Sequence, residues 1–179
     1  MGTGEQQQGS GLNVILERRS VRDFTPEPVS EEVLDRLVRA GMSAPTAKNM
    51  QPWSFIVVTG RETLDRLAEG LPYGKMLGKS PAAIVVCSMP ELANSQSVEM
   101  AVVDATCASE NILLGAQALG LGSVWVASYP YAERMAHVAD VLGIPADVIP
   151  LCVLPVGHPA VVKPPMDKYR PERIHRERW

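Results

Sequence analysis

Residues 98–127, VEMAVVDATCASENILLGAQALGLGSVWVA, determine how the rest of the chain can fold. Small and aliphatic residues occupy most faces over residues 97–119, which predicts a long helix that is buried on most of its surface. Gly120 and Gly122 follow, as is typical of a helix C-terminus. The next six residues, SVWVAS, are typical of a short buried strand. A buried helix followed by a buried strand predicts further layers of structure on both sides.

Helices and strands alternate through the flanking sequence. Ser30 is expected to cap a helix that ends near Met42. Thr59 and Glu62 predict a capping box for a second helix, and Gly143 predicts the end of a third that starts at Ala132. Strands separated by helices favour an α/β or α+β sandwich. The predicted strands are residues 54–59, 82–88, 123–128 and 148–157, and the two prolines in the last one predict an edge or irregular position.

Composition limits the class of protein. The chain has 179 residues, of which 46% are hydrophobic and 21% charged, so we expect one folded domain with its own core. A net charge of -3 argues against a nucleic-acid-binding protein. The longest apolar region is interrupted by Asp104 and Glu110, so we interpret it as a buried helix and not as a membrane span.

The two ends of the chain differ from the middle. Residues 1–11 are polar and rich in glycine, and we expect a flexible arm there, with a helix capped by Ser10 following it. The expected domain covers residues 12–179 and ends in an extended tail. Residues 163–179 carry six Lys and Arg against three Asp and Glu, a local charge of +3. A positive patch on an acidic protein suits one phosphate anion better than a nucleic acid.

Side chains that would catalyse a reaction alone are not evident. The three histidines have no metal-ligand spacing, so no metal site is predicted. The three cysteines, Cys87, Cys107 and Cys152, stand in apolar runs without a CxxC pair, which favours buried, inert thiols in a reducing cytoplasm. A Cys152–His158 nucleophile pair is the weaker alternative. If the chain is an enzyme, a cofactor is expected to carry the reaction.

The first candidate binding segment is Arg18-Arg19-Ser20-Val21-Arg22. Two or more guanidinium groups and a hydroxyl near a helix end can converge on one phosphate, because arginine supplies planar pairs of donors. A solvated basic helix end explains the same residues equally well. The segment alone leaves both interpretations open.

The second candidate segment is APTAKNMQPW, residues 44–53. Asn49 and Gln51 offer paired donors and acceptors in a loop bounded by prolines, which suits the edge of a heterocycle with alternating carbonyl and nitrogen atoms. The alternative is a structural loop in which Trp53 fills the core. Trp53 itself is expected to be a core residue.

Together these segments resemble the FMN-dependent nitroreductase family. The resemblance continues in QALGLGSVW (117–125), in PVGH (155–158) and in the basic C-terminal segment that begins at Lys168. It spans residue 12 to the end of the chain in the family's order, and the short length is similar to that of the compact members. The resemblance implies an α+β fold with a mixed sheet flanked by helices, dimerised so that each FMN lies in the interface.

The resemblance also implies roles for single residues at the phosphate end of the cofactor. Arg18, Ser20 and Arg22 would hold the phosphate and ribityl chain, with Arg19 beside them. Lys168 and Arg170 would complete this end.

Two further segments correspond to the family's contacts with the flavin ring. Trp125, Val126 and Ala127 would lie against the ring. A loop supplied by the partner subunit would contact the isoalloxazine through Pro45, Thr46, Ala47, Asn49 and Gln51. Lys75 corresponds in order but not in spacing to a residue near the polar edge of the flavin, so its role stays open.

The implied activity is an FMN oxidoreductase that passes electrons from NADH or NADPH to nitroaromatics, quinones or related electrophiles in ping-pong order. Other flavin chemistry on the same fold, such as dehalogenation or ring oxidation, is the alternative among enzymes. An FMN-binding module without turnover is the alternative outside them. The expected partners are a second copy of the chain, a nicotinamide and a small electrophile, without nucleic acid or membrane.

Overall fold

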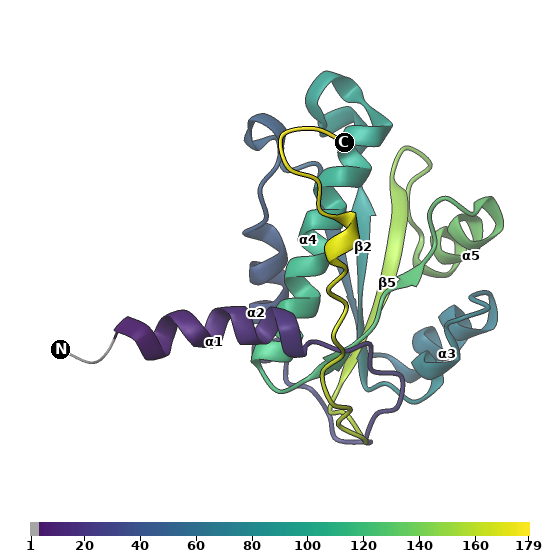
Figure 1. Cartoon of the computed structure of the whole chain (residues 1–179). Coiled ribbons are helices and arrows are strands. Elements are labelled where there is room, and N and C mark those ends of the chain that lie inside the picture. The colour runs from purple at the N-terminus through teal and green to yellow at the C-terminus, as the bar shows by residue number, and fades with distance from the viewer. Residues whose placement is uncertain (1–3) are drawn as a thin grey trace.

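The computed structural model describes residues 4–179, and within these residues a five-stranded sheet forms the middle layer of the molecule (Figure 1). The strand order is β1 (Trp53–Val58), β2 (Ala82–Ser88), β5 (Ile149–Gly157) and β3 (Gly122–Ser123), and β4 (Val126–Ala127) also pairs with β5. All four strand pairings are antiparallel. The one parallel pairing among the described residues is an isolated bridge between Ser20 and Ser123. The helices and the antiparallel sheet together confirm the expected α+β class.

Two pairs of helices cover the two faces of this sheet (Figure 1). On one face lie α2 (Glu31–Met42) and α4 (Val98–Ala118), and on the other lie α3 (Arg61–Glu69) and α5 (Ala132–Leu142). The sequence of β2 explains the two cores, because successive side chains of a strand point to opposite faces. Ile84 and Val86 pack with α2 and α4, whereas Ala83 and Val85 pack with α3 and α5. A strand covered on both faces is apolar throughout, as predicted.

Several helix ends follow the predicted signals. The Ser30 hydroxyl accepts a hydrogen bond from the Val33 N–H at 3.4 Å, and Gly143 ends α5 with φ of 66°. Glycine has no Cβ and adopts this left-handed conformation without strain. The long helix α4 is buried on much of its surface, so core packing accounts for its apolar character.

Four local predictions differ from the structure. Helix α1 (Gly4–Glu17) begins at Gly4 and not after Ser10, so helix replaces most of the expected arm; residues 1–3 lie outside the described residues. The capping box of Thr59 and Glu62 does not form, because Gly60 is the N-cap of α3 and no side chain caps it. The predicted strand 123–128 is divided into β3 and β4, and β5 is a central strand despite its prolines.

The prolines of β5 explain both differences in the sheet. Proline has no N–H to donate to a neighbouring strand. Pro150 lies at the register shift opposite Cys87, where the ladder with β2 is already irregular. Ser123 pairs with Val156 and Val126 pairs with Val153, so the unpaired residues between β3 and β4 lie opposite Leu154 and Pro155. The break leaves Trp125 outside the ladder.

The two ends of the described chain lie outside the three layers. Helix α1 projects away from the body, and in the view of Figure 1 the tail passes in front of α4 toward the C-terminus. Residues 160–179 are all exposed and contain only the short 3₁₀ turn Pro171–Arg173. None of the helices in the described part of the chain combines the length and the apolar character needed to cross a membrane.

Candidate functional site

The basic segment that follows α1 lies alongside the short strand β3. Ser20 forms a bridge with Ser123, and the Val21 N–H donates to the Ser123 carbonyl at 3.0 Å. Gly122 permits this approach, because a Cβ at this position would lie 2.6 Å from the Cβ of Val21. The segment is therefore fixed to the sheet by backbone contacts, which leaves its polar side chains available for other contacts.

Side chains of this segment line a cavity of about 290 Å³. Arg19, Ser20 and Arg22 contribute from the segment, and Lys163 contributes from the start of the tail. Arg22 is exposed and belongs to none of the ion pairs found among the described residues. This cavity joins three of the six residues predicted at the phosphate end and adds Lys163, which sequence reasoning missed.

A second cavity lies on the other side of Arg19. It joins Arg18 and Arg19 with Lys168 of the tail, as the resemblance implies. Arg18 also pairs with Glu110 of α4 at 3.4 Å, and Arg19 donates to the Pro164 carbonyl. Arg170 is not brought to either cavity, since its guanidinium donates to the Tyr169 carbonyl at 2.8 Å.

A third cavity, of about 330 Å³, lies beside the break between β3 and β4. Trp125, Val126 and Ala127, the segment that the resemblance places against a flavin ring, form one wall of it. Arg22 lines this cavity as well as the first one. The arginine segment and the Trp125 segment, which are a hundred residues apart in sequence, therefore meet at Arg22.

Besides Val124, which adjoins Trp125, three residues of the third cavity were not predicted as site residues: Tyr73, Tyr131 and Arg134. Tyr73 precedes the 3₁₀ turn Lys75–Gly78, and Tyr131 and Arg134 belong to the start of α5. Only the tertiary fold brings these segments together, so no local pattern could identify them. Lys75 is exposed and lines none of the three cavities.

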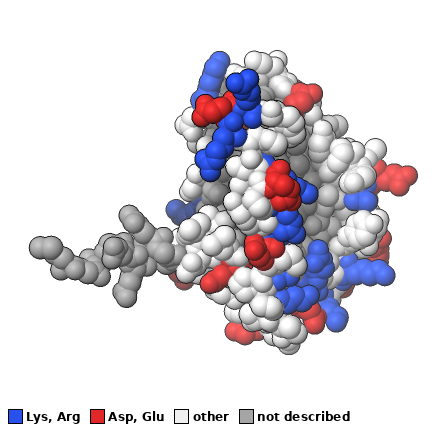
Figure 2. Space-filling view, viewed as in Figure 1, with Lys and Arg blue, Asp and Glu red and all other residues white. Residues whose placement is uncertain are grey.

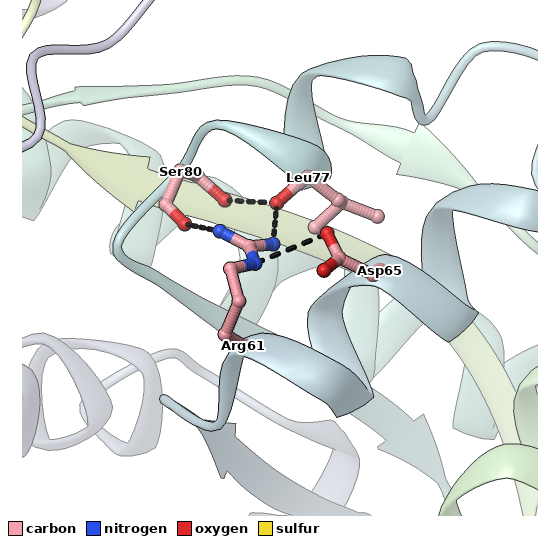
Figure 3. A network of polar contacts seen from close by, with 4 residues as sticks. All are labelled: Arg61, Asp65, Leu77 and Ser80. Carbon is pink, nitrogen blue, oxygen red and sulfur yellow. Dashed lines mark hydrogen bonds and ion pairs between the residues drawn. The ribbon is translucent and has the colours of Figure 1, made fainter.

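Arg61 fixes the segment that follows Tyr73 to helix α3 (Figure 3). Its guanidinium donates to the carbonyls of Leu77 and Ser80, the latter at 3.0 Å, and its Nε lies 3.0 Å from an oxygen of Asp65. Bonds to backbone carbonyls and to a carboxylate occupy all three nitrogens. Arg61 is thus a structural arginine that fixes residues 77–80 to α3.

The loop predicted to contact a flavin ring lies elsewhere. Pro45, Thr46, Ala47, Asn49 and Gln51 line none of the three cavities of their own chain. The loop is ordered by its own hydrogen bonds, because the Gln51 amide donates to the Asn49 side chain at 3.1 Å and the Gln51 N–H donates to the Thr46 hydroxyl at 3.1 Å. Trp53 is 8% exposed and fills the core as expected.

Asp104 of α4 supports this loop and was not predicted to do so. It is buried, and its Oδ1 accepts a hydrogen bond from the Ala47 N–H at 3.3 Å. Its Oδ2 has no partner among the described residues. The sequence signal was an acidic residue in an otherwise apolar helix, which typically marks a specific polar contact.

Positive charge gathers near these cavities. The basic residues that line them are Arg18, Arg19, Arg22, Arg134, Lys163 and Lys168, and the acidic ones are Glu17, Asp23 and Asp167. Figure 2 shows Lys and Arg side chains on the face along which the tail runs, with Asp and Glu between them. The region suits one small anion better than an extended polyanion.

The cysteines do not form a catalytic pair. Cys152 is fully buried and lies 3.5 Å from the Ser109 hydroxyl, whereas His158 faces Glu27 at 3.7 Å. Burial raises the pKa of both Cys87 and Cys152 to about 12. The expectation of buried thiols is confirmed for these two, but Cys107 is only half-buried.

Alkylation of the native protein is expected to reach Cys107 alone. The thiolate is the reactive form, and a thiol with a pKa of about 12 stays protonated well above neutral pH. We expect iodoacetamide in mildly alkaline buffer to label Cys107, and all three cysteines after unfolding in urea, as measured by peptide mass spectrometry. Labelling of Cys87 as fast as Cys107 in the native protein would contradict this expectation.

Comparison with known proteins identifies the class. A crystal structure from Parabacteroides distasonis superposes with a TM-score of 0.89 at 43% identity, covering 94% of this chain and 98% of that one. A protein of Archaeoglobus fulgidus is 43% identical over 171 residues, which are 94% of this chain and 98% of the relative. Both have the provisional name NADH dehydrogenase/NAD(P)H nitroreductase. An enzyme of Bacillus subtilis named FMN reductase (NADPH) is 30% identical in an alignment of 168 residues that covers 83% of this chain and 66% of that enzyme.

These similarities define an α+β oxidoreductase. The sequence also matches the Nitroreductase family over residues 15–72 and 69–158. The chain belongs to the nitroreductase family.

Proposed function

We propose that this protein binds FMN and transfers electrons from NADH or NADPH to nitroaromatics, quinones or related electrophiles. The observation that carries the proposal is the position of Arg22, which lines both the cavity beside Ser20 and the cavity beside Trp125. A cofactor with its phosphate in the cavity beside Ser20 and its aromatic ring in the cavity beside Trp125 would contact Arg22 in both cavities. The names of the relatives, which include FMN reductase and NAD(P)H nitroreductase, support the same cofactor and donor.

The residues present fit such a cofactor. Arg22 has no carboxylate partner among the described residues, and the Ser123 hydroxyl beside Ser20 is buried without a hydrogen-bond partner. Buried polar groups without partners in an isolated chain are typical of sites that are completed by a ligand. Arg19, Ser20, Arg22 and Lys163 would hold the phosphate, with Arg18 and Lys168 beyond Arg19, and Trp125, Val126 and Ala127 would form a wall for the ring.

The chemistry that FMN supplies when bound is two-electron transfer between a nicotinamide and an electrophilic acceptor. The chain binds and orients the participants. Its cationic side chains favour reduced, more negative states in their vicinity. In the proposed ping-pong order, a nicotinamide and an acceptor would use the cavity beside Trp125 in turn.

The proposal includes a homodimer, in which the loop at residues 45–51 completes the site of the partner subunit. Support comes from two features of the isolated chain. The loop lines none of its own three cavities, and Leu12, Ile15 and Leu16 of α1 are each more than half exposed. An apolar helix face of this kind is typical of an interface.

Sedimentation at micromolar concentration is expected to give about twice the monomer mass of 19.4 kDa. Leu12→Gln, at a residue of α1 that lines none of the three cavities, should shift the protein toward monomer and release FMN at the same time, because the loop would no longer reach its site. Exposed Val57 of β1 provides the control, since Val57→Gln removes a similar exposed apolar side chain away from α1. A monomer that retains FMN would contradict the shared site.

The absorption spectrum of the purified protein, followed by anaerobic titration with NADH and NADPH, tests the activity. A flavin spectrum that either nicotinamide bleaches, and that a nitroaromatic or quinone restores, supports the proposed reaction. A flavin that no nicotinamide bleaches favours a binding module without turnover. A bleached flavin that neither acceptor reoxidises favours other flavin chemistry on the same fold, and a colourless protein that takes up no FMN contradicts the proposal.

A further inference from the structure

Arg134 lines the cavity beside Trp125. Unlike Arg61, it is not held by an ion pair with a described residue. In addition to Arg22 and Arg134, the cavity is lined by Tyr73, Val124, Trp125, Val126, Ala127 and Tyr131. No Asp or Glu is among these lining residues. Two positive charges therefore face a largely aromatic and apolar space.

Aromatic stacking holds the Arg134 guanidinium in place. Its central carbon lies 3.7 Å from the centroid of the Tyr131 ring and 5.6 Å from that of Tyr73. Stacking uses the flat face of the guanidinium and leaves the N–H groups at its edge free for acceptors. One of these groups makes a long bond, 3.4 Å, to the Ala127 carbonyl.

Comparison with Arg61 shows what is missing at Arg134. Arg61 uses its three nitrogens on two carbonyls and on Asp65 (Figure 3). Arg134 forms none of the ion pairs found among the described residues. A half-buried guanidinium that is held by two rings and has unused donors is arranged to receive a planar anion in a bidentate contact.

We propose that Arg134 is a specificity-determining residue that binds an anionic group, a carboxylate or a phosphate monoester, on a molecule that enters the cavity beside Trp125. The proposal rests on the proposed function, in which this cavity receives the substrates. Arg22 is assigned to the cofactor, so Arg134 is the cation that a substrate would meet in this cavity. The anion has two possible sources, the 2′-phosphate of NADPH and a carboxylate on the electron acceptor.

Binding measurements on matched pairs of ligands distinguish these sources. The first pair is NADP⁺ and NAD⁺, which differ in the 2′-phosphate. The second pair is para-nitrobenzoate and para-nitrobenzamide, which differ in charge at the same size. Calorimetric titration of the FMN-loaded protein gives each affinity without turnover. NADPH is then compared with NADH, and para-nitrobenzoate with para-nitrobenzamide, by kcat/KM.

We expect Arg134→Gln to weaken binding of the charged member of at least one pair by about ten- to hundredfold, the range for loss of a charged hydrogen-bonding partner. The uncharged member should change by less than about threefold. Selective loss of NADP⁺ assigns the anion to the nicotinamide, and selective loss of para-nitrobenzoate assigns it to the acceptor. Arg66→Gln is the matched control, because Arg66 is an exposed arginine of the neighbouring helix α3 that lines none of the three cavities.

Equal losses for charged and uncharged ligands, or no loss for either pair, would overturn the proposal and leave Arg134 as a support for Tyr131. The melting temperature of each variant identifies a general loss of structure. Arg134→Lys keeps the charge but not the planar pair of donors, so it should restore only part of the selectivity. The flavin spectrum is read on the same samples, so a failure of FMN binding is seen separately from a failure of anion selectivity.

Discussion

Arg22→Ala is expected to purify without yellow colour while remaining folded. Arg22 is exposed and lies in two cavities, and it has no ion-pair partner among the described residues, so its removal leaves the core unchanged. Loss of one charged partner of a phosphate costs about 1.5–3 kcal/mol. This corresponds to roughly a ten- to hundredfold lower affinity for FMN, measured by quenching of flavin fluorescence on titration with apoprotein.

Two further variants test whether the loss of FMN affinity comes from the guanidinium at position 22 or from the loss of any positive charge. Arg36→Ala removes an exposed arginine of α2 that lines none of the three cavities, and it should retain wild-type affinity. Arg22→Lys should fall between wild type and Arg22→Ala, because lysine keeps the charge but loses the bidentate geometry. Wild-type FMN affinity in Arg22→Ala would remove Arg22 from the phosphate site, and with it the observation that carries the proposed function.

Regular elements were predictable because their signals are local. Strand β2 and helix α5 have the predicted bounds, since an uninterrupted apolar run and a terminal glycine depend only on neighbouring residues. The division of residues 123–128 into two strands was not predictable in the same way. It depends on Pro155, a residue about thirty positions away that lies opposite the break.

In the candidate site, too, the residues with a local sequence signal were predictable and those brought together by the tertiary fold were not. Arg19, Ser20 and Arg22 stand close together in sequence and line one cavity, so a local motif was enough to find them. Tyr73 and Arg134 come from separate segments, and nothing near either residue in the sequence indicates a cavity. The motif match also places Arg170 at the phosphate end, and that assignment stays a prediction, since Arg170 lines none of the three cavities and its guanidinium contacts the Tyr169 carbonyl.

Gly122→Ala is expected to lower both stability and FMN affinity, although residue 122 is buried and its side chain would not face a cofactor. A Cβ at this position would lie 2.6 Å from both Cβ and Cγ1 of Val21, closer than packed carbon atoms approach. Val21 cannot retreat without lengthening the 3.0 Å bond from its N–H to the Ser123 carbonyl. The new methyl group would therefore push the segment that carries Ser20 and Arg22 away from the sheet.

The expected cost is about 1–3 kcal/mol in the free energy of unfolding, as for other overpacked sites. For a domain of this size, each kcal/mol lowers Tm by about 2–4 °C. Gly11→Ala is the control: Gly11 lies within α1 with no atom near the position of its Cβ, and alanine is favoured there by roughly 1 kcal/mol. A melting curve and an FMN titration on each variant measure both effects.

Removing the opposing side chain distinguishes this steric mechanism from a general weakening of the strand. Val21→Gly deletes the side-chain atoms that the new methyl group would meet, so Val21→Gly combined with Gly122→Ala should bind FMN more tightly than Gly122→Ala alone. Val21→Gly by itself has a cost, because glycine loses more conformational freedom on folding.

The coupling between the two substitutions in a double-mutant cycle is therefore the decisive quantity. A favourable coupling of about 1 kcal/mol or more shows that contact between residues 21 and 122 sets the position of the arginine segment. Additive effects would contradict that mechanism and place the cost of Gly122→Ala within β3 itself.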